Sequence, residues 1–141
     1  MDLYYKILVK LARKAQKKGC IPVGAIIVKN NKIIAYAHNK RKKTNNVLDH
    51  AEIIAIQKAA KKLKNWNLSN CELYVTMKPC KMCEDVINES RIKKVHYILD
   101  NYEYKNRKEN EIKKIVFIKE NDMNNEYTIL LKNFFKKIRE K

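Results

Sequence analysis

The sequence predicts one α/β domain in which helices cover a β-sheet. Helical periodicity alternates with short β-rich runs in the order α-β-β-α-β-α-β-β-α, which is typical of layered α/β domains. The length of 141 residues suits a single domain that spans residues 1–141. The 45% of hydrophobic residues are enough for a sizeable core, so the composition does not match that of disordered chains.

The N-terminal half begins with an amphipathic pattern. Apolar residues recur every three or four positions over residues 3–18, and we expect a helix that ends at Gly19. Residues 23–28 and 33–37 are β-rich and are separated by two asparagines, which predicts a hairpin. A polar stretch, residues 39–46, comes next.

The C-terminal half continues the alternation. The predicted elements are a helix over residues 50–64, a strand around Leu73 and Val75, a helix that opens at Pro79, strands over residues 95–99 and 115–118, and a final helix. A charged connector, residues 100–114, joins the last two strands. The final helix is the clearest, because one continuous apolar face is formed by Tyr127, Leu130, Leu131, Phe134, Phe135 and Ile138.

The chain is strongly basic. It has 32 Lys and Arg against 15 Asp and Glu, a formal net charge of +17. Clustered cations favour a polyanionic partner, because binding releases counterions from phosphate backbones. A genome poor in G and C would also enrich lysine, so the position of the lysines says more than their number.

Neither a membrane span nor a signal peptide is expected. The longest apolar run is residues 21–28, and Lys6 and Lys10 interrupt the N-terminal apolar stretch. We therefore expect a cytoplasmic protein. In a reducing cytosol, four cysteines are expected to be metal ligands or buried thiols rather than disulfides.

Two short segments carry the residue types of a metal centre. His50-Ala51-Glu52 stands at the start of one predicted helix, and Pro79-Cys80-Lys81-Met82-Cys83 at the start of another. Proline suits the first helical position, which would place Cys80 and Cys83 in the first turn with their side chains adjacent. One histidine and two thiolates form a typical zinc set, and the open fourth position is the mark of a catalytic site.

Glu52 fits the proton transfer that such a site needs. Its carboxylate falls on the helix face that the apolar pattern predicts to be buried, where an unpaired acid is costly. Taken singly, the residues have plainer explanations: a capping histidine, a redox or structural Cys-x-x-Cys pair, and an acid that complements the helix dipole. Together they resemble the H-x-E and P-C-x-x-C signature of zinc-dependent nucleobase deaminases.

Further stretches resemble one family. Pro22-Val23-Gly24-Ala25 is similar to its first strand, and residues 73–77 lead into the cysteine motif as they do in the family. Ser90-Arg91-Ile92 follows at the expected distance, and Leu130-Leu131 with Phe134-Phe135 resembles the end of the last helix. On these residues the chain resembles the bacterial tRNA-specific adenosine deaminases of the cytidine deaminase-like superfamily, over nearly its whole length.

The resemblance implies a three-layer α/β/α cytidine deaminase-like fold with a central mixed five-stranded sheet. It implies a homodimer that binds the anticodon stem-loop of tRNA and hydrolytically deaminates adenosine to inosine, at wobble position 34. One zinc ion per chain would be held by His50, Cys80 and Cys83, with Glu52 as the catalytic proton shuttle. Asn39 stands eleven residues before the metal histidine, where the family has a substrate-contacting asparagine.

A basic run follows Asn39 directly. It consists of Lys40, Arg41, Lys42 and Lys43. Because Asn39 is expected at the active site, we expect this run to border the mouth of the site and to contact RNA phosphates. The alternative is that these are solvated charges in a lysine-rich chain.

The chain departs from the family pattern in three places. Lys78 replaces the usual Glu before the Pro-Cys pair, and residues 46–49 replace the usual Asp-Pro-Thr-Ala. The family's glycine-rich segment after the fourth strand is missing, and the connector instead carries Tyr102 and Tyr104. These two tyrosines are either base-stacking residues or ordinary connector aromatics.

Two other functions share parts of this pattern. A deaminase of a free base or nucleoside, of the guanine or cytidine type, would share the zinc ligands and Glu52 but would not need the basic run. A non-catalytic, zinc-stabilised RNA-binding module would not need a buried glutamate. The buried position expected for Glu52 favours an enzyme.

Overall fold

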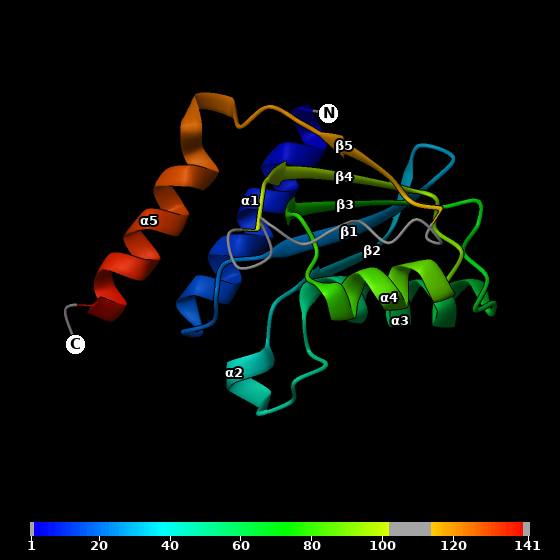
Figure 1. Ribbon diagram of the computed structural model, residues 1–141, viewed down its shortest axis with the longest axis horizontal. Helices are drawn as coiled ribbons and strands as arrows, with labels where there is room; N and C mark the ends of the chain where they lie inside the picture. The colour runs from blue at the N-terminus through cyan, green and yellow to red at the C-terminus, as the bar shows by residue number, and fades with distance from the viewer. Residues whose placement is uncertain (1, 102–113, 140–141) are drawn as a thin grey trace.

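The computed structural model describes residues 2–101 and 114–139, which form a five-stranded sheet between two layers of helices (Figure 1). The strands are β1 (Gly24–Lys29), β2 (Lys32–His38), β3 (Glu72–Met77), β4 (Lys94–Leu99) and β5 (Val116–Lys119). The helices are α1 (Asp2–Lys17), α2 (Arg41–Thr44), α3 (Ala51–Leu63), α4 (Lys81–Glu89) and α5 (Glu126–Arg139), and the 3-10 turn η2 (Met123–Asn125) precedes α5. The predicted three-layer α/β fold is confirmed.

The sheet is mixed, with the strand order β2-β1-β3-β4-β5. Strand β1 is antiparallel to both β2 and β3, whereas β3, β4 and β5 are parallel neighbours. Because β2 and β3 both oppose β1, the strands β2, β3 and β4 all end at the same edge of the sheet. Helices α3 and α4 begin at this edge and lie side by side beneath the sheet (Figure 1).

Both faces of the sheet are buried. On the α3 face, small residues of the helix such as Ala55 and Ala59 pack with Leu73 and Val75 of β3. The opposite face is covered by α1 and α5, which contribute Leu8, Ala12 and Tyr127 to a second cluster. A strand covered on both sides must be apolar throughout, which explains the continuous hydrophobic run of β1.

Gly24 allows α1 to approach β1 closely. A Cβ atom at this position would lie 2.5 Å from the carbonyl oxygen of Leu8 and 2.7 Å from Cβ of Leu11. Both are atoms that a rotamer change cannot move. The backbone N–H of Gly24 also donates to Oγ1 of Thr76, at 3.2 Å, which joins β1 to the end of β3.

Three local expectations need correction. Residues 41–44 of the polar stretch form the short helix α2. Helix α4 begins at Lys81 rather than at Pro79, because Cys80 is extended (φ −71°, ψ 173°) and serves as the N-cap.

The apolar face of α5 is not buried along its whole length. Phe135 is 40% exposed and Ile138 is 48% exposed, whereas Tyr127, Leu130, Leu131 and Phe134 are buried. Most of the predicted connector, including Tyr102 and Tyr104, lies outside the described residues. Among the helices that the structure describes, none combines the length and the apolar character needed to cross a bilayer.

We predict that Gly24→Ala destabilises the protein by about 1–3 kcal/mol, because the added methyl group overpacks the contact with α1. Urea unfolding would measure the loss. Gly19→Asn is the control, because Gly19 has φ +76° with open space around it, and asparagine tolerates this conformation. Equal midpoints for Gly24→Ala and the parent would show that α1 can shift without cost.

Candidate active site

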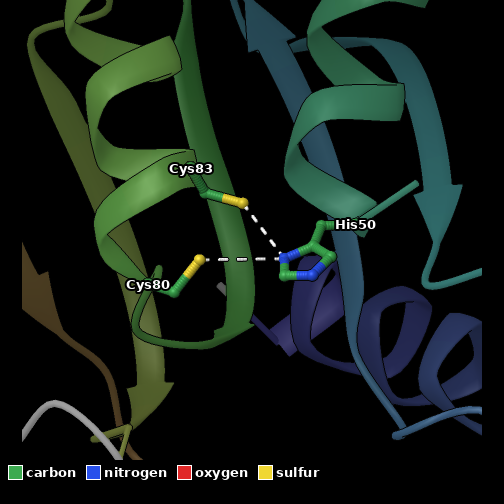
Figure 2. Close-up of side chains that lie close together, drawn as sticks. All are labelled: His50, Cys80 and Cys83. Atoms are coloured by element: carbon green, nitrogen blue, oxygen red, sulfur yellow. Dashed lines mark hydrogen bonds between the residues drawn. The ribbon is translucent and has the colours of Figure 1, made fainter. Parts of the chain in front are cut away.

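The starts of α3 and α4 bring three metal-binding side chains together (Figure 2). His50 is the N-cap of α3, in extended conformation, and Cys80 is the N-cap of α4. Cys83 lies in the first turn of α4 and is fully buried. Neither N-cap side chain caps its own helix, so both remain directed at each other across the gap between the helices.

The spacing of the donor atoms fits zinc. Nδ1 of His50 lies 3.3 Å from Sγ of Cys83 and 3.8 Å from Sγ of Cys80, and all three atoms lie within 4.8 Å of one another. A tetrahedral zinc ion with bonds of about 2.3 Å to sulfur and about 2.0 Å to nitrogen separates such a pair by roughly 3.6 Å. In the described part of the chain, this is the one group of three His, Cys, Asp or Glu side chains with such spacing.

The thiols are prepared for metal binding. Hydrogen bonds from Cys83 and His50 hold the pKa of the Cys80 thiol at about 4, against the effect of burial. The bond to Cys80, together with burial, raises the pKa of Cys83, which is therefore the donor of the pair. The position of Cys80 at a helix N-terminus also favours its thiolate. The site therefore offers a thiolate at neutral pH, as metal binding requires.

Glu52 lies two residues after His50, in the first turn of α3, and is 4% exposed. The predicted burial of this carboxyl is confirmed. Burial raises its pKa to about 7, while a backbone hydrogen bond and the nearby His50 oppose the rise. A carboxyl with a pKa near neutrality can both take up and release a proton at neutral pH.

A cavity of about 220 Å³ opens beside these residues. Its walls come from six segments of the chain and are formed by Ile21, Val23, Asn39, Arg41, His50, Ala51, Glu52, Met77, Lys78, Cys80, Asn101, Leu131 and Phe135. About half of these side chains are apolar, and polar or charged groups converge among them. This combination is typical of sites for small organic groups such as a nucleobase.

Asn39 supports the cavity wall with its amide group. The side chain is 8% exposed; Nδ2 donates to the carbonyl oxygen of Ile21 at 3.1 Å, and Oδ1 accepts from the backbone N–H of Arg41 at 3.0 Å. These bonds hold two lining residues in place. The amide keeps one N–H and one lone pair beyond them, which is enough to contact a substrate.

Two of the four residues of the basic run line hollows of the surface. Arg41 lines the cavity and also a neighbouring hollow, and Lys42 lines only the latter. Lys40 and Lys43 line neither of these two. Arg41 therefore lies at the cavity as expected, Lys42 lies at the neighbouring hollow, and the contact of the run with RNA stays a prediction.

The sequence pattern missed the wall that α5 contributes. Leu131 and Phe135 line the cavity, whereas their periodicity predicted only core packing. The length of the apolar face could have indicated this wall, because the face extends farther along α5 than the sheet can cover. Cys20 and Cys71, the two cysteines outside the metal motif, are buried free thiols, and they lie outside the donor group.

Lys78, the departure before the Pro-Cys pair, borders the cavity from the β3–α4 connection. Its ammonium group lies 4.8 Å from the ring centroid of Phe117 and 5.5 Å from that of Tyr97. Cation–π contacts of this kind hold a lysine in place at the end of a sheet. The reversed charge is therefore accommodated by the aromatic side chains of β4 and β5.

Comparison with known proteins places this fold and its site in the class of the deaminases. The family model described as MafB19-like deaminase matches residues 1–139. The tRNA-specific adenosine deaminase of Buchnera aphidicola subsp. Schizaphis graminum is 40% identical, over 96% of this chain and 94% of that protein. The corresponding protein of Bacillus subtilis is 45% identical over 67% of this chain, and the alignment covers 58% of its length.

A solved structure supports the same assignment. It was described in a study of A-to-I editing by tRNA:A34 deaminases at the wobble position of transfer RNA, and it superposes with a TM-score of 0.75. The two chains are 26% identical, and the superposition covers 82% of this chain and 95% of the other. The chain thus belongs to the MafB19-like deaminase family and, within it, to the group of the tRNA-specific adenosine deaminases.

Proposed function

We propose that this protein hydrolyses adenosine to inosine in tRNA, at the wobble position of the anticodon. The observation that carries the proposal is the meeting of the His50, Cys80 and Cys83 donors with the buried Glu52 at one cavity. The relatives that are tRNA-specific adenosine deaminases support adenosine in tRNA as the substrate.

His50, Cys80 and Cys83 would hold one zinc ion per chain. When bound, zinc supplies a Lewis acid that makes water a nucleophile near neutral pH. Three protein donors would leave one of the four ligand positions of zinc free, as a catalytic site requires. The protein contributes the fixed geometry, because both helix starts are anchored to the same edge of the sheet.

Glu52 acts as the proton shuttle. Its carboxylate accepts a proton from the attacking water and delivers it to the purine ring nitrogen, while the water oxygen adds to C6. Glu52 then transfers the second proton to the departing amino group, which leaves as ammonia, and the products are inosine and ammonia. Burial beside the cavity keeps the carboxyl from exchanging its proton freely with bulk water.

The RNA would reach the cavity from the side of α2. The base must leave its stack to enter a buried pocket. Asn39 would contact the nucleotide, and the run from Lys40 to Lys43 would contact phosphates of the anticodon stem-loop. A homodimer, which the family resemblance implies, is part of this proposal, as is a cytoplasmic location, where tRNA is found.

The metal proposal predicts one zinc ion per chain in the parent and its loss in Cys80→Ser or Cys83→Ser, because a hydroxyl is a poor ligand compared with a thiolate. Elemental analysis of the purified proteins measures this. Cys71→Ser is the matched control, since Cys71 is also buried but lies outside the donor group. Full zinc occupancy in either ligand variant would disprove the assignment.

The proposed shuttle predicts that Glu52→Gln retains zinc and fold but loses at least about 100-fold in turnover, because an amide of the same size cannot carry a proton. Single-turnover deamination rates, together with zinc content and circular dichroism, measure the three properties. A rate within about tenfold of the parent would assign proton transfer to another group.

The substrate is tested with an anticodon stem-loop that carries adenosine at the first anticodon position, alongside free adenosine, cytidine and guanine. We expect inosine in the stem-loop and no product from the free compounds. Uridine or xanthine as the main product would replace the proposal by a free nucleoside or nucleobase deaminase. Tight RNA binding with no product from any compound would indicate a non-catalytic RNA-binding module.

A further inference from the structure

Four lysines from three segments of the chain lie near His38, at the end of β2. Lys14 lies in the last turn of α1, Lys18 follows that helix, Lys40 precedes α2 and Lys58 lies in α3. We name these four residues the lysine cluster. None of them is a zinc ligand or lines the catalytic cavity.

Two direct contacts define the geometry of the lysine cluster. Nζ of Lys18 lies 3.1 Å from Nε2 of His38, and Nζ of Lys58 donates to the carbonyl oxygen of Tyr36 at 2.9 Å. Lys18 follows α1 and Lys58 belongs to α3, and these helices cover opposite faces of the sheet, so the two lysines approach the edge strand β2 from opposite sides.

His38 stays neutral among these cations. Its side chain is buried, and burial together with the charges of Lys18, Lys40, Lys14 and Lys58 lowers its pKa to about 4. A neutral ring has a free lone pair on Nε2, which can accept a hydrogen bond from the ammonium group of Lys18. The buried histidine therefore anchors one lysine of the cluster and adds no charge to it.

The ammonium groups also lie close enough to influence one another. Burial lowers the pKa of Lys58, and the charges of Lys40 and Lys14 lower it further. Like charges close together destabilise a fold slightly. A bound polyanion neutralises them, so the same charges then contribute to the binding affinity. A phosphate backbone is such a polyanion.

The lysine cluster is continuous with the catalytic cavity along the chain. His38 and Lys40 flank Asn39, which lines the cavity, and Arg41 lines both the cavity and the adjoining hollow. An RNA strand whose base occupies the cavity therefore has neighbouring phosphates within reach of this surface.

We propose that the lysine cluster binds backbone phosphates of the RNA substrate outside the reacting nucleotide. The inference rests on the proposed function, and it extends the RNA-binding surface from α2 across the end of β2 to α1 and α3. The residues concerned come from three segments of the chain, and the basic run from Lys40 to Lys43 shares only Lys40 with them.

The test compares two triple variants in the Glu52→Gln background, which leaves the RNA unreacted. Lys14→Gln, Lys18→Gln and Lys58→Gln are combined in the first variant. The second, a control that removes the same charge, combines Lys61→Gln, Lys62→Gln and Lys93→Gln, three exposed lysines outside the cluster. Affinity for the stem-loop is measured as a function of salt concentration.

Each lost phosphate contact removes roughly 0.7 from the slope of log K against log salt, so we expect a reduction of about 2 for the cluster variant and almost none for the control. An equal reduction in both variants would mean that basic charge acts diffusely, and an unchanged slope in the cluster variant would overturn the proposal. Unfolding temperatures should agree among all proteins, because exposed charges contribute little to stability.

A second measurement follows the ring of His38 directly. Its ¹⁵N resonances should shift on titration with the stem-loop, because a phosphate that engages Lys18 alters the hydrogen bond to Nε2. Inorganic phosphate is titrated in parallel, and an equal response at equal concentration would reduce the cluster to a simple anion site and overturn the proposal.

The outcomes for the lysine cluster and for the proposed function are separable. If the parent fails to deaminate the stem-loop while the cluster variant still loses its salt slope, only the proposed function fails. If the parent deaminates the stem-loop and the slope does not change, only the cluster proposal fails.

Discussion

The site depends on one constraint, the common direction of β2, β3 and β4. Because these strands end at the same sheet edge, the helices that follow β2 and β3 begin there, and their first residues face each other. His50 thereby comes within 3.3 Å of Cys83, although 33 residues separate them. A pairing register shifted by one residue would turn every side chain of the strand to the opposite face and displace the helix that follows it, which would separate the donors.

The wall of the cavity opposite the metal ligands is held by a different set of interactions. Asp122 accepts hydrogen bonds from the backbone N–H groups of Tyr127 and Thr128 and from the hydroxyl of Tyr5, which fixes the start of α5 against α1. The hydroxyl of Tyr127 donates to the carbonyl oxygen of Pro22 at 2.6 Å. The last of these bonds is buried and connects α5 to the segment before β1, so Leu131 is held at the cavity by groups outside it.

Local signals explain which parts of the site could be predicted from the sequence. The spacing of Cys80 and Cys83, together with the apolar pattern around Glu52, depends on a single helical turn, which sequence describes well. The wall formed by Phe135 and the convergence of Lys14 with Lys58 depend on how distant segments pack. Periodicity shows that a face is apolar, but it does not show whether a sheet, a cavity or solvent lies against that face.

The ionisable groups near the site fall into two sets, those buried at the cavity and the exposed cations beside it. Glu52, the proposed proton shuttle, and Cys83, a proposed metal ligand, are buried, and their pKa values are set by a few neighbours at short range. The cations beside Asn39 are largely exposed, where salt screens each of them and where only their number and arrangement matter. A net charge of +17 therefore has little influence on bond making in the cavity, and its effect is concentrated in the encounter with a polyanion and in the salt dependence of that encounter. If the protein binds RNA as proposed, substitutions of surface lysines would alter its RNA affinity while the buried donor set stays unchanged.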